Sequence, residues 1–295
     1  MIPPLPPARG PGQDGGRAEI APRYEDIAQD GRLQLTALMP GLGAAIWQGL
    51  LAKIPAIATF RAQGILPILR RLVAVGEDRP VSANVPVRYE GSFRFAREQG
   101  GDRLFANMWL EARAPIASTL GADPPADAPY ALVGRVFAEH VITRPFAPPA
   151  ERRVTRLDAP GIPPIPEDEH PFETAEALVA GSDGAASPLE GAGDVVFGTM
   201  HTDSNQHVNS LVYPRFFEEA AVRRLVEDAR VPAAHQLLAR AIELRWRRPF
   251  FTGERAHIAM RILDAAEGSG WKVGAVGAFH GGGAKPSSTV KMWFR

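Results

Sequence analysis

Residues 203–209 read Asp-Ser-Asn-Gln-His-Val-Asn, and an amphipathic run that contains Tyr213, Phe216 and Phe217 follows at once. This stretch brings a carboxylate, an amide and an imidazole together where a polar loop is expected to enter a helix. Groups of these types can polarise a carbonyl and activate a water molecule. The stretch therefore predicts a site that attacks a carbonyl group, placed at the start of a helix.

Each residue of this stretch has a predicted role. Asp203 is its only carboxylate, so we expect it to be the general base for water or the nucleophile. His207 would share or orient that water, and the amide of Asn205 would hold it. At the expected helix start, the backbone N–H groups of Val208 and Asn209 would bind the oxygen that becomes negatively charged. The alternative is that Asp203 or Asn205 merely caps the helix.

The sequence around this stretch predicts one helix followed by strands. Val208, Val212, Phe216 and Ala220 recur at four-residue spacing, as on one face of a helix. A short strand is expected before the motif, at 195–200. Alternating apolar residues predict further strands after the helix, near 242–246, 258–262, 271–275 and 290–294.

The first half of the chain repeats this plan. It predicts an apolar helix from Pro40 to about Ala62 and strands near 85–89, 104–110 and 132–138. The predicted class is α+β, with each long helix wrapped by an antiparallel sheet. We expect a disordered Pro- and Gly-rich lead-in over 1–22, a first domain over 23–150, a Pro-rich linker over 151–190 and a second domain over 191–295.

Composition excludes several classes of function. Lys plus Arg and Asp plus Glu each total 33, so no net charge attracts nucleic acid. The chain has no Cys, which removes a thiol nucleophile and thiolate metal sites, and no metal site or cofactor is predicted. The apolar region Leu42–Val75 is interrupted by charged residues and prolines, so we expect a buried helix there and no membrane span. A cytoplasmic protein is expected.

The order of elements and the motif resemble a known family. Strand, motif, helix and four strands resemble the hotdog fold, and two copies resemble the double hotdog of acyl-acyl carrier protein thioesterases. Residues 203–210 are similar to that family's Asp-x-Asn-Gln-His-Val-Asn-Asn signature, from which Ser210 departs. Tyr213 falls where an aromatic residue is usual, and we expect it to contact the substrate. The resemblance implies that the second hotdog hydrolyses acyl thioesters of acyl carrier protein or coenzyme A.

The same resemblance implies that the first hotdog shapes the acyl pocket. Trp47 and Leu50 would then line its wall, or they are simply core residues. Arg247 and Arg248 could bind a phosphopantetheine phosphate or an acidic carrier protein, although an alternating basic strand face is more often solvated. A homodimer of double hotdogs is a further expectation.

One departure leaves the activity open. The family's plant members place a catalytic Glu just past a Tyr-Arg-Arg sequence, whereas here Trp246-Arg247-Arg248 is followed by Pro249. Glu243 stands six residues earlier, about 20 Å along a strand, too far to replace it. The alternatives are an (R)-specific enoyl thioester hydratase or dehydratase, whose His falls one residue later than His207, and a non-catalytic acyl-binding protein of a lipid or polyketide pathway.

Overall fold

The structure is a computed structural model that describes residues 5–116, 123–162, 165–166, 171–180, 188–228, 230 and 237–295. The chain divides into two compact units at Phe172 and Glu173. The N-terminal unit contains 4–33 and 37–172, and the C-terminal unit contains 34–36 and 173–295. The division falls inside the predicted linker, 151–190. Parts of that segment therefore belong to the folded units.

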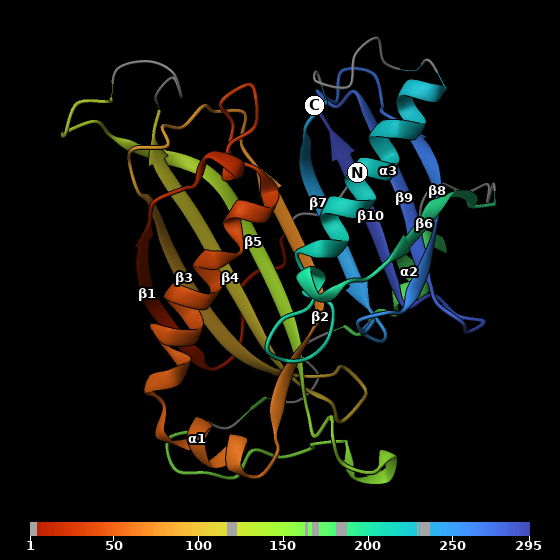
Figure 1. Ribbon diagram of the computed structural model, residues 1–295. Helices are drawn as coiled ribbons and strands as arrows, with labels where there is room; N and C mark the ends of the chain where they lie inside the picture. The colour runs from red at the N-terminus through yellow and green to blue at the C-terminus, as the bar shows by residue number, and fades with distance from the viewer. Residues whose placement is uncertain are drawn as a thin grey trace. The chain divides into compact units, whose positions relative to one another are not determined.

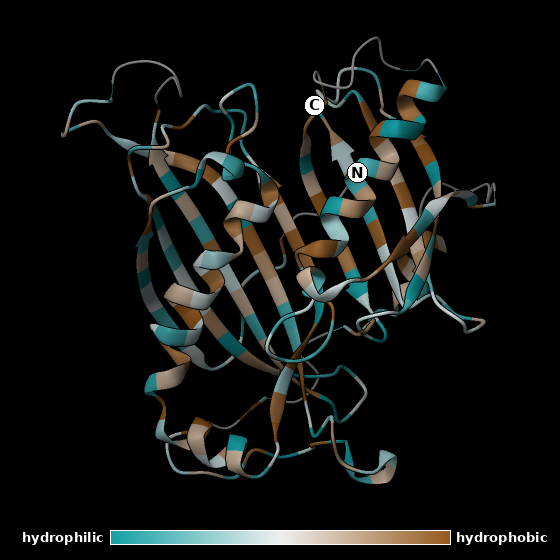
Figure 2. Cartoon of the chain, viewed as in Figure 1, coloured by the Kyte–Doolittle hydropathy of each residue, from teal (hydrophilic) through white to brown (hydrophobic). Residues whose placement is uncertain are grey.

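The N-terminal unit is built on five antiparallel strands in the spatial order β1-β3-β4-β5-β2 (Figure 1). The strands are β1 (Gly12–Ile20), β2 (Leu66–Gly76), β3 (Val87–Arg97), β4 (Leu104–Pro115) and β5 (Tyr130–Thr143). Single-turn 3₁₀ helices η1, η2 and η5 cover Tyr24–Asp26, Leu35–Leu38 and Pro149–Glu151. Figure 2 shows apolar and polar residues alternating along these strands, as expected for sheet faces.

The expected disordered lead-in over 1–22 is wrong for the residues that form β1. This strand pairs antiparallel with β3 and is mostly exposed. Its side chains are held by ion pairs that cross the two strands, such as Arg88–Glu19 at 2.8 Å and Arg94–Asp14 at 2.6 Å. An edge strand needs few apolar residues because its backbone hydrogen bonds come from the neighbouring strand. The sequence pattern therefore hides it.

The helix expected over 40–62 is interrupted. A π-helical segment η3 (Leu42–Gln48) is followed by a 3₁₀ turn η4 (Leu51–Lys53) and then α1 (Pro55–Ala62). Leu50 leaves the helical conformation, with φ −122° and ψ −64°. Pro55 occupies the first turn of α1, where its missing N–H costs nothing. The helical region predicted for the first half is therefore present, but it is broken into three segments.

The apolar segment at the start of this helix packs on the first sheet. Leu35–Lys53 is long and apolar enough to cross a membrane by length and composition alone, and 56% of its most apolar window is buried. Ala45 and Ile46 are fully buried. A Cβ atom at Gly91 of β3 would stand 2.6 Å from Ile46, so glycine is what lets the helix approach the sheet. These contacts are those of a core helix.

The C-terminal unit carries the second antiparallel sheet, in the order β7-β10-β9-β8-β6. Its strands are β6 (Glu190–Val196), β7 (Ala239–Trp246), β8 (Arg255–Asp264), β9 (Val273–His280) and β10 (Ser288–Phe294). The helices are α2 (Ala175–Ala180), the 3₁₀ turn η6 (Thr199–His201) and α3 (Val212–Glu227). In α3 the buried stripe is Tyr213, Phe217, Ala220, Ala221 and Leu225. Val212 and Phe216 are only half-buried, whereas Ala220 is buried as predicted, so the buried stripe is centred on Tyr213 and Phe217.

The polar side chains of β7 are buried, contrary to the expectation of a solvated basic face. Glu243 and Arg245 have side chains that are 0% and 4% exposed and lie 2.7 Å apart. Arg245 also pairs with Glu173 and donates to the carbonyl oxygen of Thr174 at 3.0 Å. The segment around α2 therefore covers this face of the sheet. The cover comes from the predicted linker, which sequence periodicity does not assign to the sheet.

Candidate active site

The motif folds into a tight hairpin and not into a helix start. Asp203 accepts a backbone hydrogen bond from Gln206 at 2.9 Å and donates one to His207 at 3.3 Å. Thr202 and Val208 pair beside it as an antiparallel bridge. Gln206 has φ +67°, the left-handed residue that follows the turn in hairpins of this kind. For a non-glycine residue this conformation costs about 1 to 2 kcal/mol.

The Asp203 carboxylate is fixed by two donors from its own hairpin. Oδ1 accepts the backbone N–H of Asn205 at 2.8 Å, and Oδ2 accepts the side-chain amide of Asn209 at 3.0 Å. The amide oxygen of Asn209 accepts the backbone N–H of Leu211 at 2.8 Å, which fixes the amide's orientation. A carboxylate offers about four acceptor positions, so these contacts leave room for a bound water. Asp203 itself is half-buried.

The predicted oxyanion donors are occupied. The backbone N–H of Val208 donates to the carbonyl of Phe250 at 2.8 Å, and that of Asn209 donates to the carbonyl of His201 at 2.8 Å. The helix begins only at Val212, four residues after Val208. Neither N–H can therefore bind a substrate oxygen without losing its partner. This prediction is wrong because the backbone closes a hairpin before it becomes helical.

His207 is half-buried at the base of the hairpin. Its Nδ1 lies 3.3 Å from the carbonyl oxygen of Val208. Because a carbonyl oxygen can only accept, this contact favours a proton on Nδ1 and leaves Nε2 as the acceptor. An imidazole in this tautomer can receive a proton from water or a thiol group. The contact between His207 and its neighbour thus fits the predicted role.

The loop after β7 supports the hairpin. The backbone N–H of Phe250 donates to the hydroxyl oxygen of Tyr213 at 3.3 Å, and the carbonyl of Phe250 holds Val208. Tyr213 is 1% exposed and packs among aromatic rings, with Phe197 at 6.2 Å and Phe279 at 5.4 Å. Burial raises the pKa of Tyr213 to about 12, so the hydroxyl stays neutral. Tyr213 therefore lies in the core, where its hydroxyl positions the loop and its ring is not open to a substrate as expected.

The two predicted phosphate-binding arginines contact the turn between β9 and β10. Arg247 donates to the carbonyls of Pro286 at 2.7 Å and Lys285 at 3.1 Å. Arg248 donates from Nε to the Ser287 hydroxyl at 2.9 Å. These contacts give both side chains a structural role, and their predicted binding of substrate stays a prediction.

The acid that the resemblance leads one to expect is absent at position 249. Strand β7 ends at Trp246, so Pro249 lies in the following loop and is exposed. Glu243 is fully buried against Arg245 and cannot take its place. Glu254, which the sequence reasoning missed, stands at the end of this loop and accepts the backbone N–H of Phe251 at 3.0 Å. The negative charge of Glu254 also raises the pKa of Tyr213, so Glu254 lies near the Tyr213 hydroxyl that supports the hairpin.

The predicted wall residues of the first half lie over different strands. Trp47 makes an edge-on contact with His140 of β5 at 5.3 Å between ring centroids. Leu50 lies against Gly16 of β1, because a Cβ atom added at Gly16 would stand 3.0 Å from Cδ1 of Leu50. Both are half-buried. These contacts give both side chains a packing role, and their predicted place in the wall of an acyl pocket stays a prediction.

The sequence predicted a role for the backbone of Asn209 but none for its side chain. That side chain holds Asp203. An Asp and an Asn six residues apart could have predicted this contact, if the turn between them had been predicted as well.

Among the described residues no cluster of three or more His, Asp or Glu side chains could hold a metal ion.

Comparison with known proteins gives matches in structure only. No protein-family model and no curated protein matches the sequence. Three solved structures match over 95% of this chain. A Lactobacillus plantarum protein provisionally described as an oleoyl thioesterase has 14% sequence identity and a TM-score of 0.64, and the match covers 95% of its chain. A Bacteroides thetaiotaomicron acyl-ACP thioesterase has 13% identity and a TM-score of 0.59, and the match covers 97% of its chain. The 12:0-ACP thioesterase from Umbellularia californica has 14% identity and a TM-score of 0.56, and the match covers 96% of its chain. The chain thus has the tandem double-hotdog fold of acyl-acyl carrier protein thioesterases.

Proposed function

We propose that this protein hydrolyses acyl thioesters at the 203–209 hairpin. The observation that carries the proposal is the Asp203 carboxylate, which two donors of its own hairpin hold in one orientation. A fixed carboxylate with vacant acceptor positions suits a general base, because its orientation costs no further entropy during reaction. A cap of the turn alone would not need the second donor from Asn209.

In the proposed reaction, water attacks the thioester carbon while Asp203 accepts one of its protons. The carbon–sulfur bond of the tetrahedral intermediate then breaks, and the thiolate takes up the proton from Asp203, which restores the carboxylate and gives a carboxylic acid and a free thiol. His207, with Nε2 as acceptor, would orient the water. Because the backbone donors of Val208 and Asn209 are occupied, the exposed side-chain amide of Asn205 is the proposed donor to the developing oxyanion.

The substrate class follows from the fold relatives. The Umbellularia and Bacteroides proteins of the same fold are acyl-ACP thioesterases by description. For this chain we propose acyl thioesters of acyl carrier protein or coenzyme A. The length of the acyl chain is left to experiment, because pocket length depends on tertiary packing and not on the motif.

Thiol release tests the proposal. Purified protein is assayed with octanoyl, lauroyl and oleoyl thioesters of coenzyme A and of acyl carrier protein, beside hydration of a crotonyl thioester. We expect hydrolysis, and a loss of roughly 100-fold or more in Asp203→Asn, which keeps the shape but removes the base. The matched control is Asp194→Asn, an Asp on β6 that pairs with His257 at 2.9 Å outside the hairpin.

Three outcomes would contradict the proposal. Full activity in Asp203→Asn would reduce the carboxylate to a turn cap. Hydration of the crotonyl thioester without hydrolysis would support the hydratase. Binding of acyl thioesters with no turnover, in wild type and in Pro249→Glu, would support a binding protein.

A further inference from the structure

A short antiparallel ladder forms the base of the 203–209 hairpin. Thr202 and Val208 pair as a bridge, and backbone hydrogen bonds of 2.8 Å and 3.3 Å flank it on either side. These bonds align the segment 201–203 with the segment 207–209. Because side chains alternate between the two faces of such a ladder, the residues that flank the bridge share one face. They are His201, Asp203, His207 and Asn209.

Contacts of the side chains agree with this assignment of faces. The amide of Asn209 donates to the carboxylate of Asp203 at 3.0 Å, which needs both side chains on the same face. The hydroxyl of Thr202 lies 3.3 Å from that of Thr252, so the opposite face meets the loop after β7. His201 stands two residues before Asp203 on the shared face, a separation of about 7 Å along an extended segment. An imidazole at this position is therefore a neighbour of the proposed general base.

The imidazole of His201 is fixed in one tautomer. Its Nδ1 accepts the backbone N–H of Gly198 at 3.0 Å. Since a ring nitrogen that accepts a hydrogen bond carries no proton, the neutral ring carries its proton on Nε2. Among the residues that the structure describes, this N–H has no hydrogen-bond partner. His201 therefore has one free donor.

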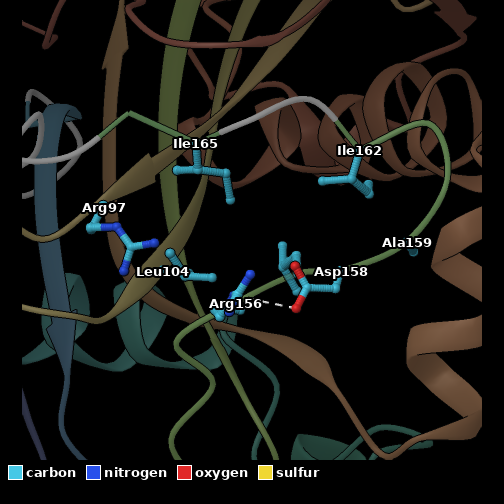
Figure 3. A pocket seen from close by; sticks show the side chains of 8 residues that line it. Arg97, Leu104, Arg156, Asp158, Ala159, Ile162 and Ile165 are labelled. Carbon is cyan, nitrogen blue, oxygen red and sulfur yellow. Dashed lines mark ion pairs between the residues drawn. The ribbon is translucent and has the colours of Figure 1, made fainter.

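The ring of His201 is also held in place. Phe216 of α3 contacts it edge-on at 5.1 Å between ring centroids, and Phe197 does so at 6.2 Å. The ring is half-buried. The open pocket of the N-terminal unit shows the contrast, because there Arg156 and Asp158 pair with each other at 3.3 Å while both side chains stay largely exposed (Figure 3). An exposed pair of long side chains is not fixed in one geometry, whereas the His201 donor is.

His201 and His207 present opposite groups on the same face of the ladder. The contact between Nδ1 of His207 and the carbonyl of Val208 leaves Nε2 of His207 as an acceptor. The contact with Gly198 leaves Nε2 of His201 as a donor. Attack of water on a carbonyl carbon needs both kinds of group, an acceptor for the water and a donor for the oxygen that becomes negatively charged.

We propose that His201 is a further catalytic residue, whose Nε2–H group donates to the oxyanion of the tetrahedral intermediate. This inference rests on the proposed thioester hydrolysis. A donor that is oriented before the reaction stabilises the new charge without reorganisation, and the neutral ring keeps its proton throughout. Asn205 is exposed at the turn, so water screens its amide. The half-buried His201 supplies a second donor that is less screened.

Two amide substitutions separate this role from a purely structural one. In His201→Asn the amide can replace Nδ1 as the acceptor for Gly198, but the Nε2–H donor is lost. In His201→Gln the amide nitrogen can replace the Nε2–H donor, but the acceptor for Gly198 is lost. We expect His201→Asn to lower kcat and kcat/KM of thioester hydrolysis about 100-fold with an unchanged KM. We expect His201→Gln to keep at least about a tenth of the wild-type turnover.

The matched control is His257→Asn, which removes an exposed imidazole that pairs with Asp194 at 2.9 Å on the strands β8 and β6. Its turnover should equal that of wild type. The reverse order, with His201→Asn active and His201→Gln inactive, would show that the ring only supports the turn and would overturn the inference. Wild type without hydrolysis, or a fully active Asp203→Asn, would contradict the proposed function and this inference together. Hydrolysis that depends on Asp203 and not on His201 would contradict this inference alone.

Nitrogen NMR of the imidazole rings tests the tautomer independently of activity and of the folding of any variant. In wild-type protein at about pH 8, where the neutral form of an imidazole prevails, we expect His201 to be protonated on Nε2 and His207 on Nδ1. The spectra of His201→Asn and His201→Gln assign the His201 signals by their loss. A wild-type His201 ring protonated on Nδ1 would overturn the inference.

Discussion

Acid is expected to destabilise the N-terminal unit through His140. This β5 side chain is 6% exposed and contacts the ring of Trp47. Burial lowers the pKa of His140 from 6.5 to about 4, because the charged imidazolium would lose its hydration. Backbone hydrogen bonds with Ala106 and Ala138 and the charge of Glu139 act in the opposite direction and do not offset the burial.

The pKa difference gives the size and the sign of the effect. Between pH 6.5 and about 4 the unfolded chain binds a proton that the folded unit does not. The free energy of unfolding therefore falls as the pH drops through this window and levels off below it. At about 1.4 kcal/mol for each pH unit, the total loss is about 3 kcal/mol, of which about 2.5 kcal/mol is reached at about pH 4.5.

Urea unfolding of wild type and His140→Leu, from about pH 7.5 to about pH 4.5, measures this loss. The difference between the two proteins is used because other carboxylates titrate in the same range. We expect wild type to lose about 2.5 kcal/mol more than His140→Leu. His257→Gln, at a side chain that is 51% exposed, should follow wild type. Parallel pH profiles for wild type and His140→Leu would refute the reasoning.

Three other substitutions have defined outcomes. Tyr213→Phe should lower the free energy of unfolding by about 1 to 3 kcal/mol in urea titrations, because it leaves the buried N–H of Phe250 unpaired. An unchanged free energy of unfolding would show that the Tyr213 hydroxyl does not support the loop. Gly91→Ala should cost about 1 to 3 kcal/mol in the same assay, because the new methyl group would stand 2.6 Å from Ile46. Pro249→Glu should raise the turnover of thioester hydrolysis, and unchanged turnover would show that no second carboxylate is needed there.

The strands that the sequence predicted correctly are those with clean alternation. In β4 the residues Leu104, Ala106, Met108 and Leu110 are all buried, as their spacing requires. β2 was missed for a physical reason. A bulge between Leu69 and Arg71 shifts its register with β5, so the period of two breaks in the middle of the strand.

The candidate site was predictable as a set of residues but not as an arrangement. Asp203, Asn205 and His207 lie on one hairpin, so the predicted polar groups are local neighbours. The predicted donors Val208 and Asn209 were wrong because their backbone pairs with Phe250 and with His201. One of these partners lies more than forty residues away in sequence, and no local pattern encodes such a pairing.

The sequence by itself determined which groups bear the chemistry and that the chain repeats one α+β plan. Residue types, the spacing of 203–209 and the alternation of apolar residues are local, and local properties are set by the chain alone. Tertiary structure decided that Asn209 holds Asp203, that Arg245 is buried and that β1 is ordered. Each of these depends on which distant segment supplies a hydrogen-bond partner or covers a face, and that choice is made by the packing of the whole unit.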